Sequence, residues 1–325
     1  MKHLSIFIAC FLLFSTPFFA QTSEKYNALI KEAWKLYQTN TYLASAQKYA
    51  EAFASNDQTA KSSDRYNAAC SWAMAGDKET AFEQLFKIAR ESNYTQYDHF
   101  TVDSDLNLLH SDPRWQELCT LVKANKEKAE ASFDKPLVAI LDSIYRSDQQ
   151  YRMQIADIEK KYGRQSEQMT AHWRLISQTD SINLINITNI LDTRGWLSAS
   201  LIGAQGNTTL FLVIQHADLA IQEKYLPMMR DAVQKGNANA GNLALLEDRV
   251  ALRKGNRQIY GSQIGQDAET GTYYVSPLED PDHVDQRREK VGLGPLADYV
   301  LRWKITWDVE AYKNQLPELE AKRKH

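Results

Sequence analysis

The residues best suited to chemistry lie between positions 215 and 263, where polar side chains interrupt apolar segments. A Gln-His-Ala-Asp sequence follows the apolar run 210–214, an Asp-Arg pair interrupts the apolar segment 243–252, and a Gln-x-Tyr-Gly-Ser-Gln sequence makes a glycine turn at 258–263. Because a buried polar group without a hydrogen bond costs about 1–3 kcal/mol, we expect these side chains to contact one another or a ligand. The candidates are Gln215, His216, Asp218, Gln222, Asp248, Arg249, Gln258, Tyr260 and Gln263.

His216 is the candidate for acid–base catalysis, because histidine is the side chain whose unperturbed pKa lies nearest neutrality. Asp218 or Asp248 would orient the imidazole or balance its charge. Arg249 would hold an anionic group through two parallel hydrogen bonds, and Tyr260 completes the catalytic candidates. This set predicts a hydrolase-like enzyme.

The same residues also have a purely structural interpretation. A satisfied polar network would fix the packing of three helices and the glycine turn without any reaction. Asp148 and Arg152, two further candidates for ligand binding, are most simply an i,i+4 pair on one helix. A histidine with no nucleophile beside it is weak support for catalysis, so both interpretations stay open.

Several other chemistries are excluded because their motifs are missing. The sequence contains no CxxC, HExxH, Walker, GxGxxG or GxSxG pattern. His216 and Asp218 alone are too few ligands for zinc, so the sequence predicts no metal and no cofactor. The formal net charge of −3 argues against a nucleic-acid binder with a broad basic face.

The elements that must position these residues are constrained by length and composition. The 325 residues exceed the roughly 100–200 typical of one domain, so two domains are expected. Hydrophobic residues make up 43% of the chain and charged residues 24%, a globular balance that excludes a disordered chain.

Residues 1–20 have the pattern of a secretory signal peptide: a basic start, an apolar run and a cleavage site after Ala20. We therefore expect a periplasmic or secreted protein without a membrane span. Export leaves Cys70 and Cys119 as the thiols of the mature chain. They are either two buried free cysteines or one disulfide, because spacing alone cannot show that they are close.

Residues 23–122, at the front of the mature chain, repeat at an offset of 36 positions. Each copy pairs two helices across a short turn, with small residues where the helices meet. The pattern resembles the tetratricopeptide repeat, which implies a short helical solenoid. The matched positions are Ala33 with Ala69, Leu36 with Trp72, Asn40 with Gly76, Ser45 with Ala81, Tyr49 with Leu85 and Ala52 with Ile88.

A third, degenerate unit closes the array. Asp103 and Asp105 begin a short helix, and Pro113 begins another. Two aspartates at this spacing could suggest Ca²⁺, but no EF-hand Gly or Glu follows, so helix capping is the favoured role. Arrays of this kind usually bind peptides or other domains. The resemblance therefore implies a scaffold with a protein or peptide partner.

A polar segment at 123–135 is expected to link the array to a second domain at 136–315, and a basic tail at 316–325 ends the chain. The apolar spacing in the second domain is mainly helical. We therefore expect an all-α protein in the main, a short solenoid followed by a helical domain with at most one small β-hairpin.

Local patterns predict two helices and two strands within the second domain. Asp180-Ser181 is expected to cap a helix, which would separate a helix at 166–178 from one at 180–194. Strands are plausible only at 257–264 and 272–275, where glycines supply the turns.

Motifs across roughly residues 137–300 resemble an uncharacterised bacterial domain of unknown function. The resemblance implies a shared architecture and a candidate shared site that includes Trp196, but no activity. The motifs are Asp148-Gln149-x-x-Arg152, Gly195-Trp196, Gln-His-Ala-Asp at 215–218, Asp-Arg at 248–249, Gln-x-Tyr-Gly-Ser-Gln at 258–263 and Arg287-Arg288-x-x-x-Gly292-Leu293.

Two functions remain open at this point. The first is an exported binding or scaffold protein that acts through its repeats. The alternative is an exported hydrolase-like enzyme that uses His216, Asp248, Arg249 and Tyr260.

Overall fold

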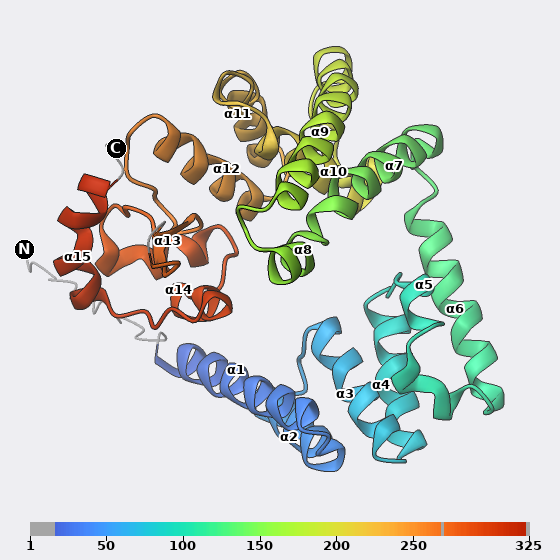
Figure 1. The fold of residues 1–325 in the computed structure, drawn as a ribbon. Helices are drawn as coiled ribbons and strands as arrows, with labels where there is room; N and C mark the ends of the chain where they lie inside the picture. The colour runs from blue at the N-terminus through green and yellow to red at the C-terminus, as the bar shows by residue number, and fades with distance from the viewer. Residues whose placement is uncertain (1–16, 268–269, 323–325) are drawn as a thin grey trace, which may run out of the picture. The chain divides into compact units, whose positions relative to one another are not determined.

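A computed structural model describes residues 17–267 and 270–322 of the chain. These residues divide into two compact units, the first ending at Ala131 and the second beginning at Ser132. Both units are built mainly from α-helices, and a two-stranded antiparallel hairpin lies in the second (Figure 1). The prediction of a mainly α-helical fold with one small hairpin is therefore confirmed.

The first unit is a stack of paired helices. Helix α1 packs on α2, α2 on α3, α3 on α4, and α4 on α6. The elements are α1 (Pro17–Gln38), α2 (Tyr42–Ala54), α3 (Ser62–Met74), α4 (Lys78–Glu91), α5 (Tyr97–Phe100), the 3₁₀ helix η1 (Ser104–Leu109) and α6 (Pro113–Ala129).

The 36-residue offset marks equivalent places in the first two helix pairs. Asn40 and Gly76 occupy the two turns, and both adopt the left-handed conformation that commonly ends a helix, with φ of 59° and 88°. Ala33 and Ala69 are fully buried where the paired helices approach. Ser45 is also fully buried, and its hydroxyl donates to the Ala33 carbonyl at 2.8 Å, which satisfies a polar group in the contact.

In the third unit of the array Asp103 is a helix cap, whereas the Asp105 carboxylate accepts the Tyr37 hydroxyl. The Asp103 carboxylate accepts the amide of Asp105 at 3.1 Å and caps η1, as the capping interpretation expects. Cys70 of α3 and Cys119 of α6 lie in one core of the array as free, buried thiols, so no disulfide joins them.

The polar segment expected to link the two units is largely helical. Helix α6 continues to Ala129, and its buried residues, Leu118, Cys119 and Val122, all precede the predicted linker. The predicted linker therefore begins as the solvated end of a helix that is anchored in the core of the first unit.

The second unit packs five helices around one core. The apolar run 210–214 lies within α10, where Leu210 and Ile214 are completely buried. The elements are α7 (Lys135–Arg152), α8 (Ile155–Tyr162), α9 (Glu167–Arg194), α10 (Ala199–His216), α11 (Leu219–Gln234), α12 (Ala240–Arg253), β1 (Ile264–Gln266), β2 (Tyr273–Val275), η2 (Pro281–His283), α13 (Val284–Lys290), α14 (Leu296–Val300), η3 (Leu301–Trp303) and α15 (Val309–Lys322).

Three details of this unit differ from the sequence predictions. The first is α9, which runs unbroken from Glu167 to Arg194 instead of stopping before Asp180. No glycine or proline interrupts this stretch, so the helix has no reason to end there. Asp180 is therefore not a cap, and its carboxylate is available for another contact.

The second difference concerns the hairpin. Strand β1 begins only at Ile264 and pairs with β2 in the register Ile264 with Val275. Residues 257–263 form an irregular loop, because side-chain oxygens take the amide hydrogens that a strand would give to its neighbour.

The third difference is the C-terminus. A basic tail is expected from residue 316, but α15 continues through the described part of that segment to Lys322. Leu316 and Leu319 are buried with Tyr312 in a core that also contains the hairpin residue Val275. Their 3–4 spacing gives the helix an apolar face despite its basic end.

The repeat register makes a direct prediction about stability. Replacing the fully buried Ala81 of α4 by leucine should overpack the helix pair and lower the free energy of unfolding by about 1–3 kcal/mol. The same change at exposed Glu83, on the same helix, should stay within about 0.5 kcal/mol. Urea melts that show equal losses for both variants would contradict this register.

Candidate functional site

A cleft of about 650 Å³ opens in the second unit, lined by the ends of α7 and α10, the middle of α9 and one residue of α12. Charged and apolar side chains share its wall. The lining residues are Asp148, Arg152, Trp173, Ile176, Ser177, Asp180, Ser181, Leu184, Val213, His216, Ala217, Asp218 and Arg249.

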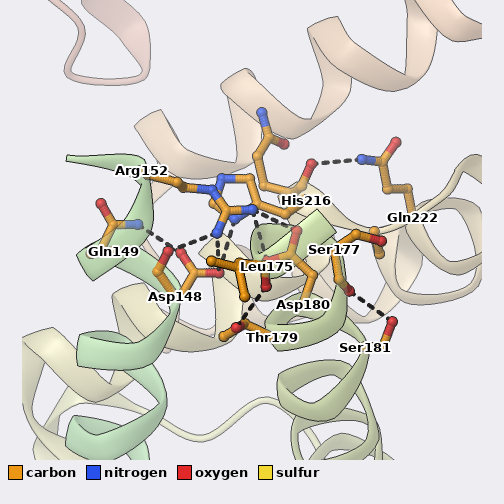
Figure 2. A network of polar contacts seen from close by, with 12 residues as sticks. Asp148, Gln149, Arg152, Leu175, Ser177, Thr179, Asp180, Ser181, His216 and Gln222 are labelled. Carbon is orange, nitrogen blue, oxygen red and sulfur yellow. Dashed lines mark hydrogen bonds and ion pairs between the residues drawn. The ribbon is translucent and has the colours of Figure 1, made fainter. Parts of the chain in front are cut away.

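An Asp–His pair lies in the wall of this cleft (Figure 2). Nδ1 of His216, the last residue of α10, lies 3.0 Å from Oδ1 of Asp148 on α7. The Asp148 side chain is 1% exposed and that of His216 is 19% exposed. The apolar run that precedes His216 buries α10 against α7, which brings the final turn of α10 to this carboxylate.

The hydrogen bond assigns the two ring nitrogens. An ionised carboxylate can only accept, so Nδ1 of His216 carries the hydrogen in this bond. In the neutral imidazole the lone pair is then on Nε2. The contact with Asp148 therefore fixes which tautomer the neutral ring of His216 adopts.

Asp148 stays ionised because several donors surround it. Gln149 donates to its Oδ2 at 2.7 Å, and Arg152 lies 3.3 Å from its Oδ1. Burial alone would raise the pKa of Asp148, but the hydrogen bond and charge of His216, together with the Arg152 charge, leave the pKa below its ordinary value.

Arg152 joins Asp148 to a second carboxylate. Its Nη2 lies 2.8 and 2.7 Å from the two oxygens of Asp180 on α9, so the predicted i,i+4 pair with Asp148 is only part of its role. Asp180 was not among the sequence candidates, because Asp-Ser before an apolar stretch resembles a helix cap. The available signal was the spacing of Trp173, Ser177 and Asp180, which places them on one face of α9.

Asp148, Asp180 and His216 could together hold a metal ion, since each offers one ligand atom and these atoms lie within 4.8 Å of one another. Arg152 already contacts both carboxylates and supplies the positive charge that they require. A cation at this position would have to displace the guanidinium. The donor set therefore fits an Arg-neutralised acidic pair better than a metal centre.

Asp248 has a different place from the one expected. It is completely buried, does not line the cleft, and accepts the backbone amides of Ile259, Tyr260 and Ser262 at 2.6–2.9 Å. Burial raises the pKa of Asp248 above its ordinary value, although the three amides oppose this shift. Asp248 therefore holds the 258–263 loop and does not orient His216.

The loop in turn positions Arg249. The Gln263 amide donates to Gln258 Oε1 at 2.8 Å, which fixes the end of the loop. Gln263 Oε1 then accepts Nε of Arg249 at 3.1 Å, and the Gln215 carbonyl accepts Nη1 at 2.8 Å. The Asp-Arg and Gln-x-Tyr-Gly-Ser-Gln motifs thus form one support for a guanidinium that reaches the cleft.

Asp218 lines the cleft and caps α11, where its Oδ1 accepts the Ile221 amide at 2.9 Å. Tyr260 contributes its backbone, since its carbonyl accepts Nη1 of Arg288 at 2.7 Å. Of the candidates, the structure brings His216, Asp218, Arg249, Asp148 and Arg152 to the cleft. The others lie outside its lining: Trp196, Gln215, Gln222, Asp248, Gln258, Tyr260 and Gln263.

Comparison with known families places the second unit. Residues 135–311 match a family described as "Family of unknown function (DUF6624)". The chain belongs to this family. The cleft lies wholly within the DUF6624 region, and the first unit has no family match of its own. No curated protein and no solved structure matches the chain. Within residues 17–267 and 270–322, no helix has the length and apolar character needed to cross a membrane.

The role of Asp248 predicts a large loss of stability on its removal. Asp248→Ala leaves one buried and two partly buried amides without an acceptor, so the free energy of unfolding should fall by about 3 kcal/mol. Asp231→Ala, which removes only an exposed pair with Lys235, should change it by about 0.5 kcal/mol or less. Matched chemical melts decide this, and a mild effect at Asp248 would show that the loop holds its shape by other means.

Proposed function

We propose that the DUF6624 cleft is a general acid–base site in which Asp148 orients His216 and His216 transfers the proton. The observation that carries the proposal is the hydrogen bond from His216 Nδ1 to the buried Asp148 carboxylate in the wall of an open cleft. A base oriented by a third group is the arrangement that acid–base enzymes require.

The pair would act as follows. Nε2 of His216 accepts a proton from a bound nucleophile, and the resulting imidazolium is stabilised by the negative charge of Asp148. Arg152 and Gln149 keep that carboxylate ionised throughout.

The hydrogen bonds of His216 bear on the identity of the nucleophile. Among the residues that the structure describes, no serine, threonine or cysteine side chain is hydrogen-bonded to His216. The arrangement therefore favours water as the nucleophile, activated by His216, and the reaction class that follows is hydrolysis. This deepens the hydrolase alternative of the sequence analysis and replaces Asp248 with Asp148 as the orienting group.

The proposal can be tested before any substrate is known. Diethyl pyrocarbonate acylates unprotonated imidazole nitrogens, and peptide mass spectrometry reports the rate at each histidine. His216 should react faster than His172, which is 5% exposed and has its Nε2 bonded to the Tyr151 carbonyl at 2.7 Å. Asp148→Asn should slow His216 and leave His172 unchanged, because the asparagine lacks the charge that stabilises the acylating imidazole.

A panel of chromogenic esters, phosphate esters and glycosides supplies the catalytic readout. On any substrate that wild type turns over, His216→Ala should lower kcat/KM by about 10²–10⁴-fold. An unreactive His216, or turnover that survives its removal, would overturn the proposal.

We also propose that the first unit is a tetratricopeptide-like array that binds a protein or peptide, and that the chain is exported. The matched turn residues Asn40 and Gly76 and the buried alanines at Ala33 and Ala69 support the first point. The second rests on the signal-peptide pattern of residues 1–20, of which residues 1–16 lie outside the described part of the chain.

Intact-mass measurement of the exported product should find a chain that starts at Gln21.

A further inference from the structure

The cleft holds a second charged group that the acid–base proposal does not use. Arg249 is largely buried in its wall, yet within residues 17–267 and 270–322 no carboxylate lies within 4 Å of its guanidinium. Arg152, the other arginine of the cleft, contacts two carboxylates. Burying a cation without a counter-ion costs desolvation free energy. A bound anion would offset that cost at Arg249.

The hydrogen bonds of Arg249 leave part of the guanidinium free. An arginine side chain has five N–H donors. Two of them bond to Gln263 and to the Gln215 carbonyl, which leaves three without a partner among the described residues. Arg249 lines the cleft and is not completely buried, so these donors are placed to meet a ligand there.

The surroundings of Arg249 do not replace the missing counter-ion. Burial, followed by the neighbouring charge of Arg253, lowers the pKa of Arg249 to about 10, and the charge of Arg152 acts in the same direction. The group remains protonated near neutral pH. Its two protein acceptors are a side-chain amide and a backbone carbonyl, which orient the guanidinium without neutralising it.

From these contacts we infer that Arg249 binds one oxyanion group, a carboxylate or a phosphate, of an organic ligand whose reacting atom lies at His216. The inference rests on the proposed function for the role of His216, but the binding of the anion requires Arg249 and not His216. Free N–H donors on neighbouring nitrogens of a guanidinium match the spacing of two oxygens of such a group.

The other charged side chains of the cleft limit the ligand to a single carboxylate or phosphate group. The Asp148 and Asp180 carboxylates are held by Arg152, and Asp218 caps α11. These three carboxylates face the same space as Arg249 and would repel a polyanion. A ligand with a single oxyanion can reach Arg249 while keeping its other atoms away from them.

The rest of the ligand should be partly apolar. Trp173 is 50% exposed, and with Leu184 and Val213 it gives the cleft an apolar wall. An inorganic anion would leave this wall in contact with water. An organic acid or a phosphate monoester would cover it and add the free energy of apolar burial to that of the ion pair.

The test uses two simple probes on the full chain. Phenyl phosphate and benzoate carry the same ring on a phosphate and on a carboxylate, so comparing their affinities separates the two sources of the oxyanion. Isothermal titration calorimetry is run at an ionic strength matched with sodium chloride, which removes general screening effects. Wild type should bind at least one probe, and the tighter probe identifies the headgroup.

Three variants make the result specific. Arg249→Met should raise the Kd about ten- to a hundredfold, the loss expected for charge-assisted hydrogen bonds. Arg249→Lys keeps the positive charge but lacks the planar guanidinium, so its Kd should lie between those of wild type and Arg249→Met. This variant still tests the inference if Arg249→Met unfolds. Arg174→Met, an exposed arginine of α9 outside the cleft lining, should bind like wild type.

The outcomes separate this inference from the proposed function. If neither probe binds wild type, or if Arg249→Met and Arg249→Lys both bind as wild type does, the inference is wrong and Arg249 serves only to pack α12 against the loop. Probe binding that requires Arg249, together with an unreactive His216, would keep the anion site and remove the acid–base proposal.

Discussion

The second unit is organised by the need to keep one carboxylate charged away from water. Asp148 is 1% exposed, and an isolated ionised carboxylate at that depth would be prohibitively costly. Its partners come from its own helix, through Gln149 and Arg152, and from the end of α10, through His216. Arg152 extends the network to Asp180 on α9. Three helices are therefore fixed to one another by the same group that fixes the tautomer of His216.

A second buried carboxylate obeys the same constraint with a different solution. Asp248 is neutralised by no arginine or histidine within the described residues, and it is satisfied by three backbone amides of one loop. Asp248 therefore has a structural role, because the three hydrogen bonds that it accepts come from the main chain of the loop. The loop then holds Gln263, and Gln263 holds Arg249. Asp148 lines the cleft and is bonded to His216, whereas Asp248 lies outside the lining and holds the loop that positions Arg249.

Local spacing explains which parts could be predicted from the sequence. The turn at Asn40 and Gly76 and the buried alanines follow from a repeat whose partners are near in the chain. The clustering of polar groups around 215–263 also follows, since isolated buried polar groups are rare. The identity of the partners does not, because Asp148 lies 68 positions from His216 and its i,i+4 pairing with Arg152 offers a sufficient local explanation.

The wrong predictions at Asp180 and at residues 257–263 have the same cause, a contact between residues distant in the sequence. Asp180 resembles a cap because sequence cannot show that α9 continues through it to meet Arg152. The 257–263 segment has residues suited to a strand, but Asp248 supplies its amides with acceptors and removes the need for a neighbouring strand. In each case the local sequence pattern favours one structure, and a contact with a side chain distant in the sequence produces another.

The central claim is that Asp148 sets the protonation pattern of the His216 ring, and ¹⁵N NMR of the imidazole tests it most directly. Spectra of the neutral ring should show the hydrogen on Nδ1 and a bare Nε2, and Asp148→Asn should disturb this pattern without affecting the ring of His172. A neutral His216 with its hydrogen on Nε2, or a pattern that does not respond to the loss of the Asp148 charge, would contradict the account.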